Sequence, residues 1–511
     1  MLTRMLVAAT ALALMHCATA APAAARISDK MEFGTLSNGV RYFIVPRPAA
    51  PVFTGMVFVD AGSAEERTNE TGIAHLLEHM AFKGTPWVGT RDWEKERPLL
   101  ARIEEVGTSL TLERQRPAPD KARVDELAGQ LADLHKQAAR LVIPNEYDNL
   151  VTREGGQEIN ASTSADWTNY YMTLPSNRLE FWALLESQRL LHPAWREFYL
   201  ERDVVAEERR MSIEDSPDGR IYEEFLAASF KAHPYRTPII GWMSDIQSLT
   251  IRRVSDFYRR WYVPGNMVVL LVGDVDRDRA LPVLEKYFGT IEPRPAPPRV
   301  NTVEPPQSGE KRVRVRLDAE PQLWIGWHKP TFPDEDMYVF EVIQFLLSDV
   351  GRSSRLYERL IKADHICQSA DSFTAPGDKY PNLFCLRLVP RAPHTAAEAE
   401  AAALAEIERL KNEPVAAAEL DKVRNQIDAH MIMSVESNRG LARRLGAYYL
   451  ASGDPQILDT MRDRMSAVTP QDIQRVAQKY FTPENRTVVE LVSTRGEEPS
   501  GEGRTTAGGA E

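Results

Sequence analysis

Cysteine is scarce in this chain of 511 residues, which contains three. An excess of basic residues is also lacking, because the formal net charge is -11 at pH 7. Proteins that bind nucleic acid usually present a basic face, so we expect no nucleic-acid partner. Long apolar runs are missing too: the run from Met5 to Met15 is too short to span a bilayer, and no second one follows. We therefore expect no stable membrane anchor.

The N-terminus has the three-part pattern of a secretory signal. Arg4 precedes the apolar run, and small residues follow it at Ala18 and Ala20. The pattern predicts a signal peptide over residues 1–20, with cleavage after Ala20 or as late as residue 25. The protein is therefore predicted to be exported to the periplasm and to be soluble after the segment is removed.

The two cysteines beyond this segment, Cys367 and Cys385, lie in predicted strands on either side of the turn-rich stretch TAPGDKYP. In an oxidising compartment they could form a disulfide between the strands. Two separate buried thiols are an equally good interpretation, and the sequence leaves both open.

An internal repeat divides the chain into two domains. The stretch LTIRRVSDFYRRWYVPGNMVVLLVGDV resembles VTPQDIQRVAQKYFTPENRTVVELVS, and each predicts a helix capped by a threonine, then a proline, an asparagine and a β-branched strand. The proline-rich residues 291–311 fit an extended linker. We therefore expect domains at 27–290 and 311–494, and the Gly-rich tail 495–511 predicts disorder.

Each domain mixes strands with amphipathic helices. NGVRYFIVP and VFTGMVFVDAG are typical of strands, whereas SNRLEFWALLESQRLLH and VFEVIQFLLSDV have apolar residues at helical spacing. The pattern predicts an α+β fold of two homologous domains, each a mainly antiparallel sheet packed with helices. Residues 92–141 predict an inserted hairpin of two charged helices, which is either a solvated surface feature or a gate for substrate.

The chemically richest stretch is GIAHLLEHMAFKGT. On a helix His75 and His79 project from one face at the spacing i, i+4, so both can bind one metal ion, and Glu78 can reach a water on it. A catalytic zinc needs a third protein ligand. The helix predicted for YLERDVVAEERRMSIED places Glu201 and Glu208 on one face, so one can bind zinc and the other support a ligand. The alternative is a surface helix with solvated acids.

These residues resemble the inverted zinc motif H-x-x-E-H of the pitrilysin-type (M16) metallopeptidases, and in particular their two-domain, processing-peptidase-like members. The blocks AGSAEE, INASTSADWTNYY, ERDVVAEERRM and GRSSRLYERL also look like family blocks and stand in the family's order. The resemblance covers both halves of the chain, and it implies the family's fold, in which such a chain forms half of a clamshell.

The resemblance also implies a function. The chain would be a zinc-dependent endopeptidase with one Zn²⁺, held by His75, His79 and Glu208. Glu78 would be the general base and Glu201 a supporting acid. Glu207 competes with Glu208 for the ligand role, but the seven-residue step from Glu201 favours Glu208. A peptide substrate would pair as an extra strand along Asn160, Ala161 and Thr163.

One departure from the family concerns the oxyanion. Where the family often has an Arg and a Tyr seven residues apart, this chain aligns Ile361 and Gln368, and neither is a good substitute. This predicts a heterodimer with a second M16-like chain that lacks the zinc motif and supplies Arg and Tyr. One alternative is that the alignment is shifted and that Arg355 and Tyr357 or Arg359 serve instead. Others are a homodimer and a non-catalytic subunit of an M16-type complex.

Overall fold

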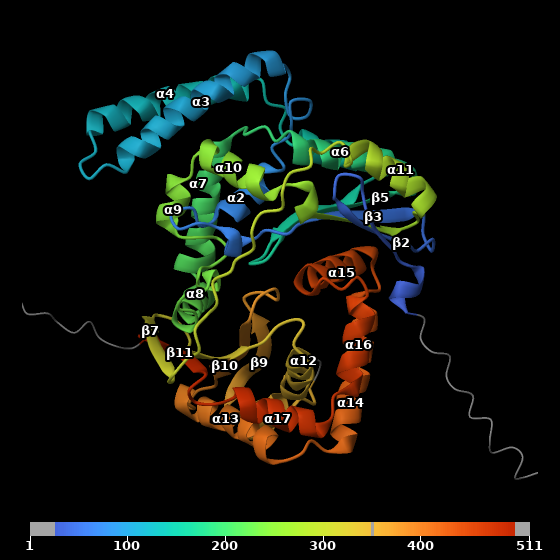
Figure 1. Ribbon diagram of the computed structural model, residues 1–511. Coiled ribbons are helices and arrows are strands. Elements are labelled where there is room, and N and C mark those ends of the chain that lie inside the picture. Colours follow the sequence, from blue (N-terminus) through green and yellow to red (C-terminus); the bar gives the residue numbers. More distant parts are fainter. Residues whose placement is uncertain (1–25, 349–351, 496–511) are drawn as a thin grey trace, which may run out of the picture.

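The computed structural model describes residues 26–348 and 352–495 (Figure 1). The predicted signal peptide and the tail from residue 496 lie outside the described residues. Within the described ranges, no helix combines the length and the apolar character that crossing a membrane requires.

The first half of the chain builds a six-stranded sheet. Its strands are β1 (Glu32–Thr35), β2 (Arg41–Pro46), β3 (Val52–Val59), β4 (Gln157–Thr163), β5 (Thr168–Pro175) and β6 (Met267–Gly273). Their order is β1-β2-β6-β3-β5-β4, and every neighbouring pair is antiparallel except β2 and β6. β4 is therefore an edge strand, with one side free of strand partners.

The second half repeats this arrangement with five strands. They are β7 (Lys311–Leu317), β8 (Gln322–Lys329), β9 (Cys367–Ala375), β10 (Asn382–Pro390) and β11 (Arg486–Ser493). Their order is β7-β11-β8-β10-β9, and again one pair, β7 and β11, is parallel. Without β1, the two sheets share strand order and directions. The α+β fold of two homologous, mainly antiparallel units is confirmed.

The asparagine of the sequence repeat forms equivalent hydrogen bonds in both halves. Each side-chain amide donates to the last turn of the preceding helix and to the end of a neighbouring strand. Nδ2 of Asn266 donates to the carbonyls of Trp261 and Asp60, and Nδ2 of Asn485 donates to those of Tyr480 and His328. Thr250 and Thr469 cap the two helices as expected. The sequence repeat therefore reflects repeated hydrogen bonding.

Helices cover both sheets (Figure 1). In the first half they are α2 (Ile73–Met80), α3 (Trp93–Arg114), α4 (Lys121–Ala139), α5 (Glu146–Arg153), α6 (Leu179–Leu191), α7 (Phe198–Arg209), α8 (Pro217–Ser229), α9 (Met243–Ser248), α10 (Ile251–Trp261) and α11 (Arg277–Tyr287). In the second half they are α12 (Asp336–Leu347), α13 (Ala396–Asn412), α14 (Ala417–Ser434), α15 (Asn438–Ser452), α16 (Ile457–Ala467) and α17 (Pro470–Tyr480). Shorter helical segments are η1 (Ile27–Lys30), η2 (Ser63–Glu65), η3 (Ser176–Arg178), η4 (Arg210–Glu214), η5 (Pro234–Arg236), η6 (Pro264–Asn266) and η7 (Tyr357–Ala363).

The two halves exchange one helix each. Helix α8 leaves the first half and packs on β7 and β11 of the second sheet, where its Phe225 lies in a shared core with Trp324. Helix α15 of the second half packs in turn across β3 and β6 of the first sheet, against Phe58 and Leu270. Every residue of β6 is buried, as expected for a strand covered on both faces.

A buried ion pair also joins the halves. The turn between β9 and β10 inserts Lys379 into the first half, where its Nζ lies 2.7 Å from Oδ1 of Asp60 and 3.5 Å from Oε1 of Glu65. The backbone amides of Asp378 and Lys379 donate to Asp166, in the turn between β4 and β5. The second half therefore supports the turn at the end of the edge strand.

The inserted hairpin is present as predicted, with α3 and α4 projecting from the body of the protein (Figure 1). It is not simply a surface feature, however. Glu96, Ile103 and Gly107 of α3 are buried, and the ring of Tyr199 from α7 occupies the space that a Cβ on Gly107 would need. The part of α3 around Gly107 therefore packs against α7.

Of the two interpretations that the sequence left open, the structure shows the separate thiols: Cys367 and Cys385 are free and both are buried. They lie in the predicted neighbouring strands, but the register pairs Cys367 with Pro390 and Cys385 with Phe373. At about 3.4 Å per residue the two positions are far beyond disulfide range.

Candidate metal centre

The carboxyl group of Glu66 caps the N-terminus of helix α2. Gly72, at φ 85°, starts the turn, and Glu66 accepts hydrogen bonds from the backbone amides of Gly72 and Ala74, each 2.9 Å long. A carboxyl oxygen at a helix N-terminus is favourable, because it accepts from N–H groups that have no partner within the helix. This arrangement fixes the start of the helix at Ile73, two residues before His75.

The two faces of α2 differ sharply. The buried face is apolar and consists of Ile73, Ala74, Leu76, Leu77 and Met80. His75, Glu78 and His79 lie on the other face, where a helical spacing of three or four residues brings them together. The predicted presentation of these three side chains by one helix is therefore observed.

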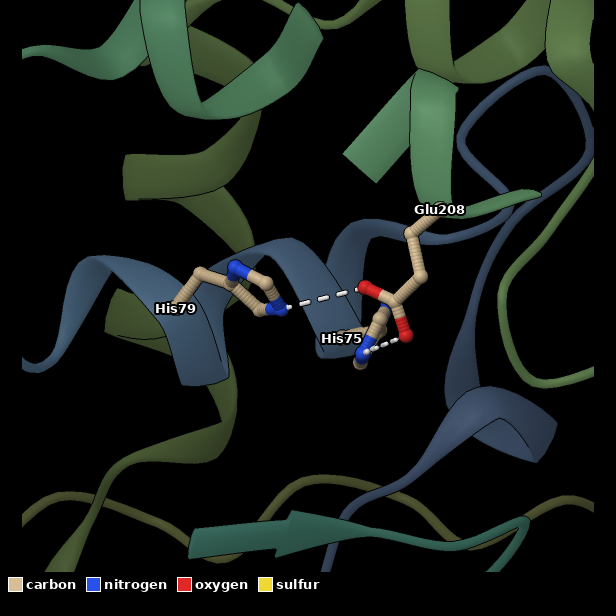
Figure 2. Close-up of side chains that lie close together, drawn as sticks. All are labelled: His75, His79 and Glu208. Atoms are coloured by element: carbon tan, nitrogen blue, oxygen red, sulfur yellow. Dashed lines mark ion pairs between the residues drawn. The ribbon is translucent and has the colours of Figure 1, made fainter. Parts of the chain in front are cut away.

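Helix α7 brings the distant acids to α2. Phe198, Val205 and Ala206 are buried, which turns Glu201 and Glu208 towards α2. Figure 2 shows Glu208 reaching both histidines. Oε1 of Glu208 lies 3.7 Å from Nε2 of His75, and Oε2 lies 3.5 Å from Nε2 of His79.

These three side chains fit a zinc ion. One donor atom from each of His75, His79 and Glu208 lies within 4.8 Å of the other two, and within the described residues this is the one such group of three potential ligands. Two imidazoles and a carboxylate are the donor set of a catalytic zinc. Ligand atoms bound tetrahedrally at about 2.0–2.1 Å would be roughly 3.4 Å apart, close to the 3.7 and 3.5 Å that separate the Glu208 oxygens from the nitrogens of His75 and His79.

The second acid, Glu201, holds the other nitrogen of His79. Its Oε2 lies 3.4 Å from Nδ1 of His79, so the imidazole lies between the two carboxylates with Nε2 towards Glu208. Burial lowers the pKa of His79, but its bonds to Glu201 and Glu208 outweigh burial and raise the pKa to about 9. Burial, with the charge of His79 added, lowers the pKa of His75 to about 4. The two acids therefore favour positive charge at His79, whereas burial favours the neutral imidazole at His75.

Glu78 faces the edge strand. The hydroxyl of Thr163 in β4 donates to Oε2 of Glu78 over 2.5 Å. Burial raises the pKa of Glu78, although the Thr163 hydrogen bond and the charge of His79 act in the opposite direction. A partly buried carboxyl with a raised pKa, beside a metal-binding group, suits a general base.

A cavity of about 340 Å³ opens beside these residues. One wall consists of His75, Glu78, Glu208 and the β4 residues Ala161, Ser162 and Thr163. The other is mainly apolar, and consists of Ser212, Ile213, Tyr222, Pro238, Ile239 and Ile240. The cavity can therefore accept an apolar side chain while the edge of β4 lies next to the candidate catalytic group.

Other predicted residues lie outside this cluster. Asn160 lies in β4 but does not line the cavity, and its Oδ1 accepts the amide of Ala161 at 2.8 Å. Glu207, the alternative ligand, forms an ion pair with Arg210. The cavity-lining residues named above all come from the first half, so neither Ile361 nor Gln368 contributes to it.

The two alternative arginines already form ion pairs. Nε and Nη2 of Arg355 donate to Glu419 at 2.9 and 2.8 Å, and Nε of Arg359 donates to Asp364 at 2.5 Å. Neither guanidinium lines the cavity. The family positions and their alternatives in this chain, Tyr357 included, are thus all absent from the lining of this cavity.

Sequence reasoning missed three supporting residues, Glu66, Lys83 and Arg196. Glu66 caps α2, Lys83 contacts Glu201, and Arg196 binds the segment that carries Lys83. A signal existed for Glu66, since an acid shortly before a helix often caps it. No spacing rule connects Lys83 or Arg196 to their partners, which are distant in the sequence.

Two family models match the chain. Residues 44–114 match "Insulinase (Peptidase family M16)" and residues 248–427 match "Peptidase M16 inactive domain". The first match contains α2, and the second lies wholly after α7.

Named relatives and solved structures agree with these matches. The chain is 30% identical to "Zinc protease PqqE" of Helicobacter pylori over 90% of its length and 93% of that protein. It is 25% identical to "Mitochondrial-processing peptidase subunit beta" of Lentinula edodes over 88% of this chain and 87% of that one. A crystal structure of a protease from Helicobacter pylori superposes with a TM-score of 0.75 at 28% identity, covering 91% and 99% of the two chains. The periplasmic protease PqqL from Escherichia coli shares the fold, with a TM-score of 0.67 at 20% identity over 92% of this chain and 48% of that one.

Proposed function

This chain belongs to peptidase family M16, and on that premise we propose that it is a zinc-dependent endopeptidase acting on peptides or unfolded polypeptide segments in the periplasm. The observation that carries the proposal is the convergence of His75, His79 and Glu208, next to Glu78 and a free strand edge. A candidate metal site, a candidate general base and a strand edge that can pair with an extended peptide therefore lie next to one another.

In this proposal His75, His79 and Glu208 hold one Zn²⁺. When bound, zinc supplies Lewis-acid chemistry, polarising the scissile carbonyl and acidifying water. Glu78 takes the proton from the attacking water and delivers it to the leaving amine. Thr163 holds the Glu78 carboxylate in place through its short hydrogen bond, and Glu201 orients His79 through Nδ1.

The edge of β4 is the proposed substrate site. A peptide that pairs with Asn160, Ala161 and Thr163 as an extra strand is held through its backbone, so sequence selectivity is loose. The apolar wall of the adjacent cavity favours an apolar side chain near the scissile bond. Folded proteins offer few free extended segments, which favours peptides and unfolded chains.

A non-catalytic role is the second candidate, and the match to an inactive-domain model motivates it. That match covers residues 248–427, whereas His75, Glu78, His79, Glu201 and Glu208 all lie before it. A subunit with no catalytic role would have no use for Glu78 at the metal-binding cluster. The complete cluster therefore favours the enzyme.

Metal removal tests the proposed activity. Protein recovered from the periplasmic fraction should contain one zinc per chain by mass spectrometry, and N-terminal sequencing should show cleavage after Ala20 or soon after it. A chelator should abolish cleavage of an unstructured apolar peptide, and added zinc should restore it. Full cleavage by zinc-free protein would refute the proposal, and zinc binding without cleavage would favour a non-catalytic role.

We further propose that a second M16-like chain completes the site. The Arg and Tyr expected for oxyanion stabilisation are absent at Ile361 and Gln368, and the cavity is lined by the first half alone. The Lentinula edodes relative is named as a subunit, and the PqqL structure is about twice as long as this chain. Both suit a partnership of two such units.

The partner is tested with purified chain. Alone it should bind zinc but cleave peptide slowly, and a partner chain with Arg and Tyr but without H-x-x-E-H should raise kcat by about 10²–10³-fold, the contribution of one oxyanion donor. Size-exclusion chromatography with light scattering gives the assembly in each sample. Full activity of the isolated chain as a monomer or homodimer would contradict the heterodimer.

A further inference from the structure

We propose that Lys83 is a positioning residue of the metal centre, which holds Glu201 in the orientation that fixes His79 for zinc. The inference rests on the proposed function in one respect: it takes Zn²⁺ as the ion bound by His75, His79 and Glu208. It assigns a role to a residue that binds none of those three ligands itself, since the ion-pair partners of Lys83 are Glu197 and Glu201.

The contacts form a chain from Lys83 to the metal ligand. Nζ of Lys83 lies 2.5 Å from Oε1 of Glu201, and the other carboxylate oxygen, Oε2, lies 3.4 Å from Nδ1 of His79. Each oxygen of Glu201 therefore has one partner. The Lys83 and Glu201 side chains are 23% and 16% exposed, so solvent screens this ion pair less than a surface pair.

The arrangement limits how Glu201 can turn. With Lys83 on one oxygen, the other oxygen remains directed at His79, and the imidazole keeps Nε2 towards Glu208. An outer hydrogen bond of this kind orients a metal-binding histidine and increases its basicity. Without the ammonium group, the half-buried carboxylate can rotate towards solvent, and His79 loses its fixed orientation.

A second interaction holds the backbone that carries Lys83. Arg196 is almost completely buried, and each of its five N–H groups has an acceptor. Nη1 donates to the carbonyls of Lys83 at 2.5 Å and Val88 at 3.1 Å, Nη2 donates to the carbonyl of Thr85 at 3.1 Å, and Nε and Nη2 donate to Glu96 at 2.6 and 3.0 Å.

Two glycines allow this close approach. Gly84 and Gly89 have φ values of 84° and 89°, and a Cβ on either would lie 2.9 or 2.7 Å from Nη1 of Arg196. The segment after α2 thus wraps around one guanidinium. Because Glu96 belongs to α3, the root of the inserted hairpin helps to hold Lys83 in position.

Zinc affinity tests the inference without relying on turnover. In full-length, metal-free protein, zinc is titrated in competition with a chromophoric chelator. Lys83→Met should raise the zinc dissociation constant by about 10–100-fold, the usual effect of losing an outer partner. The matched control is Lys362→Met, which removes a Lys–Glu pair from an exposed position in the other half and should leave the constant unchanged.

A double variant shows whether Lys83 acts through Glu201. In a Glu201→Gln background, Lys83→Met should change zinc affinity by no more than about twofold, because the link is already broken. An equal loss in both backgrounds, or wild-type affinity in Lys83→Met, would overturn the inference. If Lys83→Met fails to fold, Lys83→Gln provides the same comparison, with the unfolding temperature of the metal-free protein as the check on folding.

The outcome also separates this inference from the proposed function. A wild-type chain that binds no zinc would refute the proposed function itself. A chain that binds zinc normally with methionine at position 83 would refute the positioning role alone.

Discussion

Glu78→Gln should retain one zinc per chain and lose about 10²–10⁴-fold in kcat/KM, the usual contribution of a general base. Glutamine preserves the size of the side chain and can still accept the hydrogen bond from Thr163. Its amide cannot take a proton from the attacking water. The measurement pairs zinc content by mass spectrometry with cleavage of a fluorogenic peptide.

The matched control is Glu105→Gln, which makes the same chemical change on the projecting hairpin, where the side chain is 67% exposed. Its zinc content and turnover should equal those of the wild type. Cleavage at the wild-type rate by Glu78→Gln would remove Glu78 from the base role, and loss of zinc would show that its effect is on the metal instead.

Glu208→Ala should abolish both zinc binding and peptide cleavage. Its carboxylate is the anionic member of the cluster and bridges the Nε2 atoms of His75 and His79. The fall in zinc affinity should therefore exceed the roughly 10–100-fold that loss of an outer partner costs. The chelator competition described for Lys83 measures it.

The neighbouring residue provides the control. Glu207→Ala removes an identical group one position away, but Glu207 points to Arg210 and is half exposed. Zinc affinity and turnover should be unaffected. If Glu207→Ala loses zinc and Glu208→Ala does not, the ligand assignment on α7 has to be exchanged.

The sequence predicted the local part of the candidate centre well, because local geometry determines it. His75 and His79 meet on one helix face through the helical repeat alone. Assigning Glu208 as the third zinc ligand needed the family resemblance, since nothing in the residue spacing shows that α7 lies against α2. Choosing Glu208 over Glu207 likewise depended on the step from Glu201, and the structure places Glu208 beside both histidines.

The supporting interactions were beyond sequence reasoning for a physical reason. Arg196 is 113 positions from Lys83 and 100 from Glu96, and its burial is tolerated because each donor has an acceptor. Whether each donor of Arg196 has an acceptor depends on tertiary packing. From the sequence alone, Arg196 is a charged residue that would ordinarily be exposed. The sequence could not decide between a disulfide and two free thiols for a similar reason, because strand register, which separates Cys367 from Cys385, is set by the whole sheet.

The strand pattern predicted the sheets but not how they are covered. β6 is buried on both faces, which explains its continuous apolar run, yet its second face is covered by α15 from the other half. The domain limits 27–290 and 311–494 follow the linker and the repeat. They remain a prediction, and the packing of α8 and α15 crosses them.

Because of this exchange of α8 and α15, neither repeat can bury its apolar surface without the other. A chain that ended at the linker would leave the apolar surface around Phe58 and Leu270 open to water, and would leave α8 without the sheet that holds it. Only η4 separates α8 from α7, so the distant sheet also anchors the helix that carries Glu208. The second repeat, which carries none of the candidate zinc ligands, is thereby a structural determinant of the site in the first.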